Sequence, residues 1–447
     1  MMPRFTRRRV LLAVAVTLIG IPVGWWLIAS WTMSRELAEA IAEAEADLPR
    51  WRLHELEEDR EHVPDAENSA LQAMRVEKLR GRVYPSMSPR YGKLFQNLPP
   101  TAQLNQEQID LIREALDKIP EAIAEARKLK DMPRGRFVIE YADNPFLTTV
   151  DPLQRTRSVA ELLQHDAMLR AQEGQADKAV ESCQAIVQLS RSMQGELTLI
   201  AHLIRIVLET IAAIVTERVL AQGVPSEGAL ASLQKCLRDA DAPEALLHAV
   251  RGERAFSHQY CENLRGGKVR WYDLRNNPNS GNSLPLYDRL ADQFPMLVLR
   301  HQPDHLRFLN QMVATAKLPV MERGEAIERM EKALQATPKS ERNKLTEILA
   351  PSLVKVHHAD VRRMIDNRAA VAGLACERYR LRHGRWPDSL QALVQAGLLE
   401  AVPSDPMDGK PMRYRRTSEG VVIYSVGLDR TDDGGKIDRE RPWMTPG

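Results

Sequence analysis

The hydrophobic pattern of the chain opens with residues 10–33, which contain no charged side chain. At about 1.5 Å per residue, a helix of this length reaches about 36 Å, more than the roughly 30 Å of a bilayer's hydrocarbon core. A secretory signal peptide is the alternative, with Arg7, Arg8 and Arg9 as its basic region and small residues near Ala29. The apolar part of a signal peptide normally spans only about 7–15 residues, so the length favours a membrane anchor.

The charges on either side of this segment predict its orientation. Arginines precede it and acidic residues follow it, so the positive-inside rule places the N-terminus in the cytoplasm. The acidic residues are Glu36, Glu39, Glu43 and Glu45. Trp25, Trp26 and Trp31 suit the membrane–water interface. We therefore expect a bacterial-type inner-membrane protein that crosses the lipid bilayer once, through residues 10–33, with the bulk of the chain in the periplasm.

Apolar residues then recur at three- and four-residue spacing through most of the chain, which is typical of amphipathic helices. In residues 34–48 they are Leu37, Ile41, Ala44 and Leu48. We expect this helix to be continuous with the membrane helix. A second clean pattern, in residues 105–130, is interrupted by Pro120, which either kinks the helix or begins a new one.

The helical signal is strongest in residues 154–222, where two helices are joined by a turn. This turn, Gly174-Gln175-Ala176-Asp177-Lys178-Ala179-Val180, resembles the turn and second-helix start of a tetratricopeptide repeat. In that family Gly permits the tight turn and Ala the close helix contact. Stable solenoids need about three repeats and no clear period is visible elsewhere. An ordinary helical hairpin inside a bundle is the alternative.

Residues 197–220 are apolar almost all round and could be taken for a second membrane span. His202, Arg205 and Glu209 interrupt this apolar surface, so we predict a buried core helix instead. Ser226 is in the position of an N-cap for the helix that follows.

Residues 264–300 carry Gly266, Gly267 and an asparagine-rich run, which predict a surface loop or a linker. The fold class is therefore mainly α, with a small C-terminal α+β module. The predicted parts are a cytoplasmic basic leader (residues 1–9), a transmembrane helix (10–33), an N-terminal helical region (34–150), a central helical domain with hairpin repeats (151–360) and the C-terminal module (361–447).

The pattern changes after Gly384, where a short helix around Leu390 precedes turn residues at 407–410. Two short strands follow, at 411–416 and 420–426, and residues 417–419 join them as a β-hairpin. The block contains Ala375-Cys376-Glu377-Arg378-Tyr379-Arg380, His383-Gly384-Arg385-Trp386-Pro387, Asp405-Pro406, Arg413-Tyr414 and Tyr424-Ser425-Val426-Gly427 before an Asp/Gly-rich loop.

Together these motifs resemble the globular part of type II secretion major pseudopilins, over roughly residues 360–440. In that family the terminal loop binds calcium, so the resemblance implies calcium ligands at Asp429, Asp432, Asp433 and Asp438. The N-terminal span has neither the family's Phe-Thr-Leu-Ile-Glu start nor its intramembrane glutamate. We therefore expect a borrowed domain, not a fibre subunit, with a possible association with an envelope secretion system.

The spacing of the loop residues also bears on calcium. Asp429, Thr431, Asp433 and Glu440 fall at the first, third, fifth and twelfth places of an EF-hand-like loop, with Gly434 sixth. An EF-hand needs a helix on both sides, and here a predicted strand precedes the loop. A solvated acidic turn is the alternative, in which Asp and Gly satisfy the backbone geometry.

Composition narrows the classes of function. Lys and Arg number 62 against 60 Asp and Glu, a net charge of +2, which argues against nucleic-acid binding. Four cysteines are too few and too widely spaced for a disulfide scaffold or a CxxC zinc site, although Cys236 and Cys261 could pair in the periplasm.

Specific catalytic motifs are absent: the sequence has no HExxH, GxSxG, P-loop or GxGxxG. His301 and His305 stand four apart, but Pro303 lies between them, so we predict capping or surface roles. The adjacent pair of histidines before Asp360 reads as a solvated helix face.

We therefore predict an extracytoplasmic interaction or structural protein with a helical scaffold, unidentified protein partners and no catalytic residues. The alternative is an extracytoplasmic enzyme whose site is assembled from residues distant in sequence. A cleft with buried carboxylates or histidines would favour the enzyme, and a smooth groove of Leu, Ala and Asn would favour peptide or protein binding.

Overall fold

The computed structural model describes residues 7–83, 85–95, 98–242, 244–275, 286–337, 343–418 and 420–436, and its account of side chains begins at Gly20. The described chain is mainly helical, with one two-stranded antiparallel sheet near its C-terminal end. This confirms the mainly α fold class and the C-terminal hairpin.

The elements follow one another in a long series of helices. The helices are α1 Arg7–Asp47, α2 Leu53–Glu58, α3 Ser69–Arg80, α4 Tyr91–Phe95, α5 Gln106–Asp117, α6 Pro120–Arg127, α7 Asp151–Gln172, α8 Ala176–Arg191, α9 Leu199–Gln222, α10 Glu227–Ala240, α11 Ala245–Arg265, α12 Trp271–Arg275, α13 Leu286–Gln293, α14 Met296–Leu299, α15 Gln302–Ala316, α16 Val320–Ala336, α17 Lys344–Leu349, α18 Leu353–His383 and α19 Leu390–Gln395. The strands are β1 Arg413–Arg416 and β2 Val421–Tyr424. Short 3-10 turns lie at Asp65–Glu67, Pro85–Met87, Lys128–Asp131 and Pro145–Leu147.

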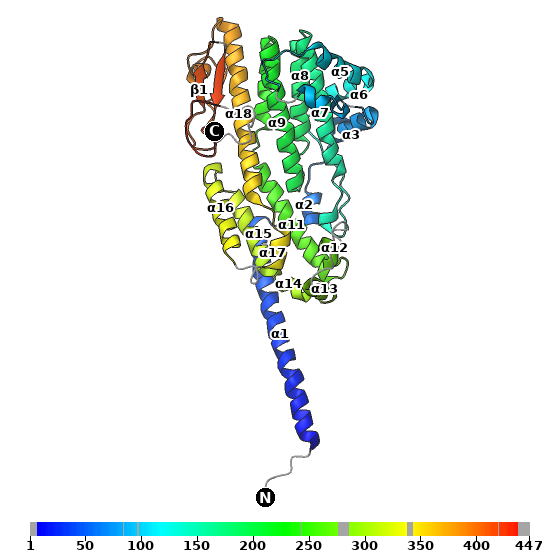
Figure 1. Ribbon diagram of the computed structural model, residues 1–447. Coiled ribbons are helices and arrows are strands. Elements are labelled where there is room, and N and C mark those ends of the chain that lie inside the picture. The colour runs from blue at the N-terminus through cyan, green and yellow to red at the C-terminus, as the bar shows by residue number, and fades with distance from the viewer. Residues whose placement is uncertain are drawn as a thin grey trace.

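The helices form an elongated body, and α1 projects from one end of it (Figure 1). Helices α3 and α5–α9 lie in the half far from the N-terminus, together with the C-terminal hairpin. Helices α11–α17 lie in the half from which α1 emerges. The long helix α18 runs between the two halves, so it connects them mechanically.

The far half is built around the hairpin of α7 and α8. Leu162, Ile186, Leu208 and Leu233 from α7, α8, α9 and α10 are all fully or almost fully buried in one apolar cluster. The same cluster includes Leu374 of α18, together with residues of the C-terminal block. The C-terminal module therefore packs into the core of the helical body instead of enclosing a separate core.

The near half has smaller clusters. One joins α11, α15, α16 and α18 through residues such as Val250, Met312 and Val356. Another surrounds Trp271, which is completely buried with Leu299 and Leu345. The prediction that residues 264–300 form an irregular stretch is therefore wrong for its described part, which contains α12, α13 and α14. These helices are very short, and the turn residues between them hid their pattern.

Helix boundaries follow the expected local chemistry. Pro120 is the first residue of α6, so it begins a new helix and does not kink a continuous one. Ser226 caps α10 by accepting a hydrogen bond from the backbone N–H of Ala229 at 3.3 Å. Helix α1 is continuous from Arg7 to Asp47, which confirms that the pattern around Leu37 extends the N-terminal helix.

Helix α9 is the one candidate span by length and hydropathy within the part of the chain whose side chains are described. Of its most apolar window, 61% is buried inside the molecule. It contacts α7, α8, α11 and α18, as the predicted core helix should. For the predicted span at residues 10–33, the structure describes only some of the side chains.

The C-terminal hairpin pairs Arg413 with Tyr424 and Arg416 with Val421 in antiparallel register. Asp405, which is completely buried, organises the turn before it. Its carboxylate accepts hydrogen bonds from the Ser425 hydroxyl at 2.8 Å and from the Val426 backbone N–H at 2.9 Å. Asp405 of the Asp-Pro motif therefore fixes this turn to the residues that follow β2.

Candidate functional site: the groove beside the N-terminal helix

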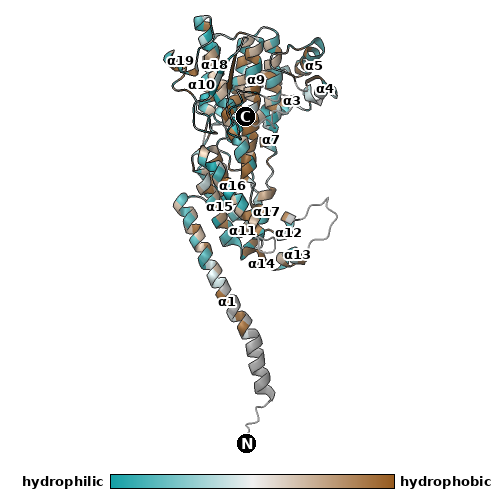
Figure 2. Cartoon of the chain, turned by 60° about the vertical axis from the view of Figure 1, so that its left-hand side comes forward, coloured by the Kyte–Doolittle hydropathy of each residue, from teal (hydrophilic) through white to brown (hydrophobic). Residues whose placement is uncertain are grey.

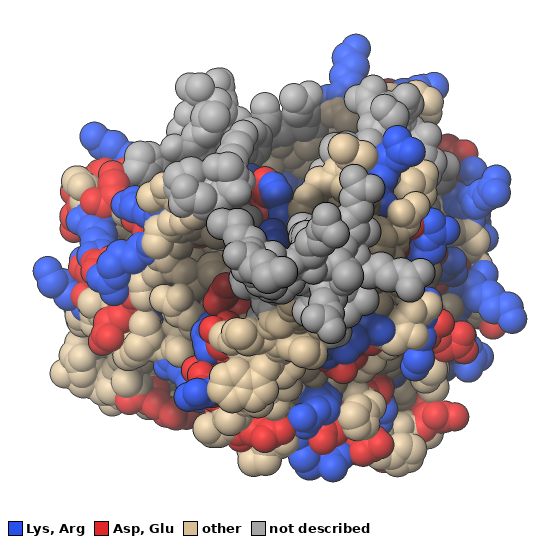
Figure 3. Space-filling view, turned by 90° about the horizontal axis from the view of Figure 1, so that it is seen from below, with Lys and Arg blue, Asp and Glu red and all other residues tan. Residues whose placement is uncertain are grey.

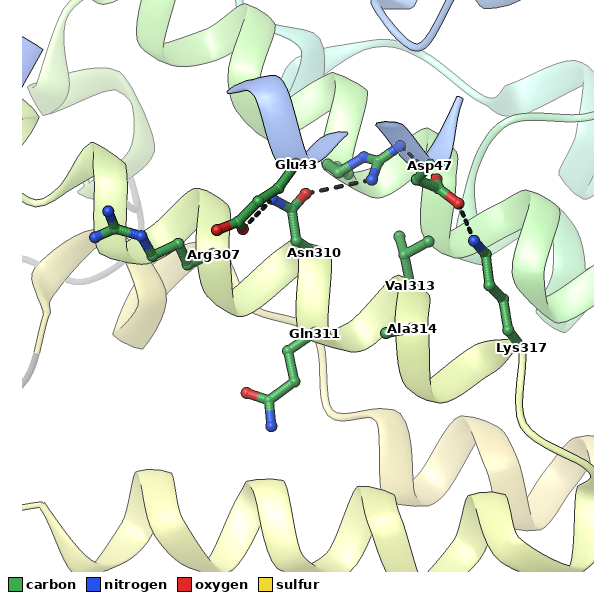
Figure 4. A pocket seen from close by; sticks show the side chains of 9 residues that line it. Glu43, Asp47, Arg307, Asn310, Gln311, Val313, Ala314 and Lys317 are labelled. Atoms are coloured by element: carbon green, nitrogen blue, oxygen red, sulfur yellow. Dashed lines mark hydrogen bonds and ion pairs between the residues drawn. The ribbon is translucent and has the colours of Figure 1, made fainter. Parts of the chain in front are cut away.

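A shallow groove runs along the line where α1 meets α15, next to α11 (Figure 4). Its volume is about 360 Å³. Charged and amide side chains make up most of its lining: Glu43, Asp47, Arg254, Arg307, Asn310, Gln311 and Lys317, with Val313 and Ala314. The groove therefore sits at the junction between the projecting helix and the body.

The last three turns of α1 lie here because their apolar residues share one face. Leu37, Ala40 and Ala44 are buried against Leu306 of α15 and against Trp51, which follows α1. Their three- and four-residue spacing places them on the same side of the helix. Burial of this stripe explains why the C-terminal part of α1 packs on the body.

Asp47, the last residue of α1, is held by three cations, two from α11 and one from Lys317, the residue after α15. Its carboxylate lies 2.8 Å from Arg251 Nη2 and 2.9 Å from Arg254 Nη2, and it also pairs with Lys317. Burial alone would raise the pKa of Asp47, but the hydrogen bonds from Arg251 and Lys317 and the charge of Arg254 hold it well below its usual value. Asp47 is therefore ionised at neutral pH.

Arg254 connects Asp47 to the rest of the junction. Its side chain is almost completely buried, and its second terminal nitrogen donates a hydrogen bond to Asn310 Oδ1 at 3.2 Å. Its guanidinium also lies 5.2 Å from the centre of the Trp51 ring. Asn310 in turn donates to the Ala40 carbonyl oxygen at 2.9 Å. This connected set of polar contacts joins α1, α11 and α15 into a rigid joint.

The lining limits what this groove can do chemically. Both lining carboxylates have partners, because Asp47 has its three cations and Glu43 accepts a hydrogen bond from Asn310 at 3.2 Å. None of the described lining residues is a Ser, Cys or His. The arrangement is suited to fixing the projecting helix on the body.

A second hollow lies between α10, α18 and the turn at 397–400. Gln234 donates to the Leu398 carbonyl oxygen at 2.8 Å and accepts from Arg378 at 2.8 Å. Arg378 also pairs with Glu227. These bonds attach the C-terminal block to the helical body, and the described residues that line this hollow include no histidine.

A buried ionic network between α9 and α18 is the feature that the sequence interpretation missed. Arg363 lies 2.7 Å from Glu209 and 2.9 Å from Asp360, and His202 Nε2 lies 3.4 Å from the same Asp360 oxygen. Burial would raise the pKa of Asp360, but His202 and Arg363 hold it well below the usual range. Arg205 completes the network with Glu209 at 2.8 Å.

The prediction of a solvated helix face is therefore wrong for His357 and Asp360, whereas His358 is half-buried. His357 and Asp360 are buried because α16 and α9 cover that side of α18. A sequence signal existed on the other helix, where His202, Arg205 and Glu209 share one face of an otherwise apolar segment. Such a face needs buried partners of opposite charge.

Three side chains in the near half are linked by hydrogen bonds and include a serine and a histidine, the residue types that many hydrolases use. Ser257 Oγ lies 2.6 Å from His305 Nε2, and His305 Nδ1 lies 3.0 Å from Thr346 Oγ1. All three are buried, and burial lowers the pKa of His305 to about 3. The Ser257 hydroxyl is not accessible to a substrate, so these three side chains form a polar network within the core. His305 is not a surface or capping residue as predicted, although His301 does lie just before α15.

The predicted calcium ligands lie on the exposed loop after β2, and Asp438 lies outside the described residues. Asp429, Asp432 and Asp433 each accept a backbone N–H bond at 3.0 Å from the residue two positions later. These are the hydrogen bonds of Asx turns. Within the described residues, no group of three or more His, Cys, Asp or Glu is placed to hold a metal.

The four cysteines are all buried and free. Cys236 belongs to the far apolar cluster and Cys261 to the cluster around Trp271, so the pairing considered from the sequence does not occur. Comparisons of the chain with protein-family models, with curated proteins and with solved structures found no match.

Proposed function

We propose that this protein is a single-pass membrane-anchored scaffold that holds an elongated helical body outside the cytoplasm and binds a protein partner there. The observation that carries the proposal is the division of α1 into two parts. Its C-terminal turns are buried and clamped at Asp47, whereas its described apolar residues before Met33 lie outside the body (Figure 2).

The exposed part of α1 does not have the surface of a water-exposed helix. Ile21, Leu27, Ile28 and Trp31 are all more than half exposed. Large apolar side chains gathered in this way on a projecting helix are expected to be covered by another apolar phase. A bilayer supplies that phase, and the uncharged length of residues 10–33 matches its thickness. The arginines before the segment support a cytoplasmic N-terminus.

The junction at Asp47 supports a scaffold role for the body. A flexible tether would need no buried arginine and no continuous helix at the point where the chain leaves the membrane. Here the helix runs without interruption into a packed, ion-paired joint. Such a joint sets the direction of the body relative to the bilayer, which is useful for presenting a binding surface.

Helix α9 offers the surface that supports protein binding. Ile200, Leu203 and Ile214 are exposed, and the half-buried Val207 and Ile211 lie between them on the same face of the helix. Spacings of three, four, four and three residues make this a continuous apolar stripe. Figure 2 shows apolar residues along much of α9. A stripe of this kind fits the apolar face of a helix from a partner protein.

The anchor is tested by protease treatment of spheroplasts from bacteria that produce the full chain. Protease added outside should digest the body and leave only a short N-terminal fragment protected. Full protection of the body would contradict the proposed topology.

The binding face is tested with a photoreactive amino acid at Leu203 or Ile214, each introduced into the full membrane-bound chain. We expect crosslinks from both positions and none from Val138, which is also apolar and 78% exposed. A crosslink to a second copy would identify the partner as the protein itself. Absence of crosslinks at both α9 positions would remove this face from the proposal.

A further inference from the structure

Resting on the proposed membrane anchor, we infer that α13 and α14 form a second membrane contact, which inserts apolar side chains into the interface of the bilayer beside α1. The contact consists of Leu286, Leu290, Phe294 and Met296, with Arg289 and Arg300 beside them. We call this set the membrane-facing patch.

The patch has inverted amphipathicity for a helix in water. Leu286, Leu290 and Phe294 follow a four-residue spacing, and they are 69%, 39% and 59% exposed. The opposite face of α13 is buried and carries Asp288, which accepts a hydrogen bond from the Trp271 indole at 2.9 Å. A surface helix of a soluble protein normally buries its apolar side and exposes its polar side. Here the apolar side points away from the core.

Contacts between α1 and α15 place the patch at the level of the membrane. Arg307 reaches the Glu36 carbonyl oxygen and Asn310 reaches that of Ala40, so contacting residues differ in number by 271 and 270. The Lys317–Asp47 pair keeps the same offset. The two helices therefore run parallel and side by side, with a nearly constant offset in residue number.

Extending this offset toward the N-terminal ends of both helices shows which residue of α1 lies beside the first residue of α15. Gln302 lies level with Thr32, which is at the end of the uncharged residues 10–33. Helices α13 and α14 precede Gln302 and lie at the end of the body from which α1 emerges (Figure 1). Their exposed side chains are therefore at the height expected for lipid headgroups and the first acyl carbons.

The charge around the patch suits an anionic lipid surface. Arg289 and Arg300 are both exposed. Asp292, near the end of α13, is paired with Arg270 at 2.5 Å. Figure 3 shows this end from below, where Lys and Arg side chains alternate with Asp and Glu around stretches of uncharged surface. Basic residues next to outward-facing apolar side chains are typical of segments that bind at the membrane interface.

The test uses the full chain reconstituted into vesicles of phosphatidylcholine and phosphatidylglycerol. A single cysteine replaces Phe294, Leu27 or Leu381, and each variant carries an environment-sensitive fluorophore at that position. The four native cysteines are buried, which directs the labelling to the new one. Leu381 lies near the far end of α18 and is the control that should stay in water.

We expect lipids with a quencher in the acyl chain to reduce the fluorescence at positions 294 and 27, but not at 381. Quenching at 27 alone would overturn the second contact and leave the anchor in place. Quenching at neither position would contradict the anchor itself. A blue-shifted label at 294 without lipid quenching would show that protein, such as a second copy, covers the patch, which would also overturn the inference.

A matched pair of substitutions separates the patch from general effects. Leu290→Glu should reduce lipid quenching of a label at position 294, because a carboxylate is costly to bury among acyl chains and repels anionic headgroups. Leu203→Glu, an equally exposed leucine on α9, should leave the quenching unchanged. Equal quenching in both variants would contradict the inferred insertion.

Discussion

At the scale of single residues, Asp47 carries much of the junction between the projecting helix and the body. One carboxylate balances three cations, of which Arg254 is almost completely buried. Removing one partner of a buried charge pair leaves the other without compensation in a medium that solvates it poorly.

We predict that Asp47→Asn loosens the joint and costs about 3–5 kcal/mol, the range for breaking a buried ion pair. The free energy of unfolding, measured by urea titration of the detergent-solubilised chain, should fall by this order. Hydrogen exchange should also accelerate in residues 37–47.

Glu43→Gln is the matched control, because Glu43 lines the same groove but is exposed and accepts only from Asn310. Its substitution should change stability by less than about 0.5 kcal/mol. Equal effects of the two substitutions would contradict the special role of Asp47.

His305 predicts a pH dependence of stability. Burial lowers its pKa to about 3 in the folded state, whereas the unfolded value is about 6.5. The unfolded chain therefore takes up a proton first, and the contribution of His305, fully present above pH 6.5, is lost as the pH falls towards 3. The loss should reach about 2 kcal/mol at pH 5.

The measurement compares the wild type with His305→Gln, whose amide supplies a hydrogen-bond donor and an acceptor but does not titrate. Urea titrations at pH 7 and pH 5 should show a smaller loss of stability in the variant than in the wild type. His62→Gln, at an exposed position, should behave as the wild type does. The same loss in all three proteins would show that His305 does not titrate in this way.

At the scale of elements, α11 passes so close to the turn before α9 that only glycine fits at the crossing. A Cβ on Gly252 would lie 1.7 Å from the Leu197 carbonyl oxygen, which is backbone and has little room to move. A side chain at position 252 could therefore be accommodated only by moving α11 or the turn before α9.

We therefore predict that Gly252→Ala destabilises the protein by at least about 1–3 kcal/mol, the usual cost of overpacking. Thermal melting followed by circular dichroism checks this. Gly228→Ala in α10 is the control, because a Cβ there meets nothing within 4 Å. It should raise stability by about 0.5–1 kcal/mol, since alanine is the better helix former. A melting point unchanged by Gly252→Ala would show that the crossing can relax.

The acidic loop after β2 gives a prediction at the same scale. Its three described aspartates already accept backbone N–H bonds from their own loop. We therefore expect millimolar calcium to leave hydrogen exchange of residues 429–436 unchanged relative to chelator. Protection that appears with calcium and disappears in Asp429→Ala would instead support the ligand set implied by the pseudopilin resemblance.

At the scale of the whole molecule, the anchor and the body are separable in principle. Among the residues of α1 whose side chains are described, Leu37 is the first that is buried against the body, and the ion pairs of Asp47 lie at the end of the same helix. The two large apolar clusters of the body contain no described residue that precedes Leu37.

We predict that a chain lacking residues 2–33 leaves the membrane fraction and keeps its helical circular dichroism spectrum and its melting temperature. The deletion removes the bilayer-spanning segment but none of the joint. Fractionation of cells and melting of the purified fragment provide the measurements. Aggregation of the fragment with loss of its cooperative transition would show that the body depends on the anchor for folding.

The sequence by itself determined the elements that follow from local pattern. The 3.6-residue periodicity identified the continuous N-terminal helix and the apolar α9, and turn residues with alternating strands identified the C-terminal hairpin. Pro120 and Ser226 acted as local signals because proline and serine affect only the first turn of a helix. Periodicity reports which residues share a face, and it needs no knowledge of the partner.

Only the tertiary structure decided which polar faces are buried. Asp360 looks like a solvated position until α9 brings His202 beside it from a distant part of the sequence. Asp47 looks like any helix terminus until α11 and Lys317, the residue after α15, supply its cations. The cost of burying a charge is offset only by partners within a few ångströms, and such partners are set by helix packing. The outward-facing Leu286 and Phe294 likewise acquire meaning only from the register between α15 and α1.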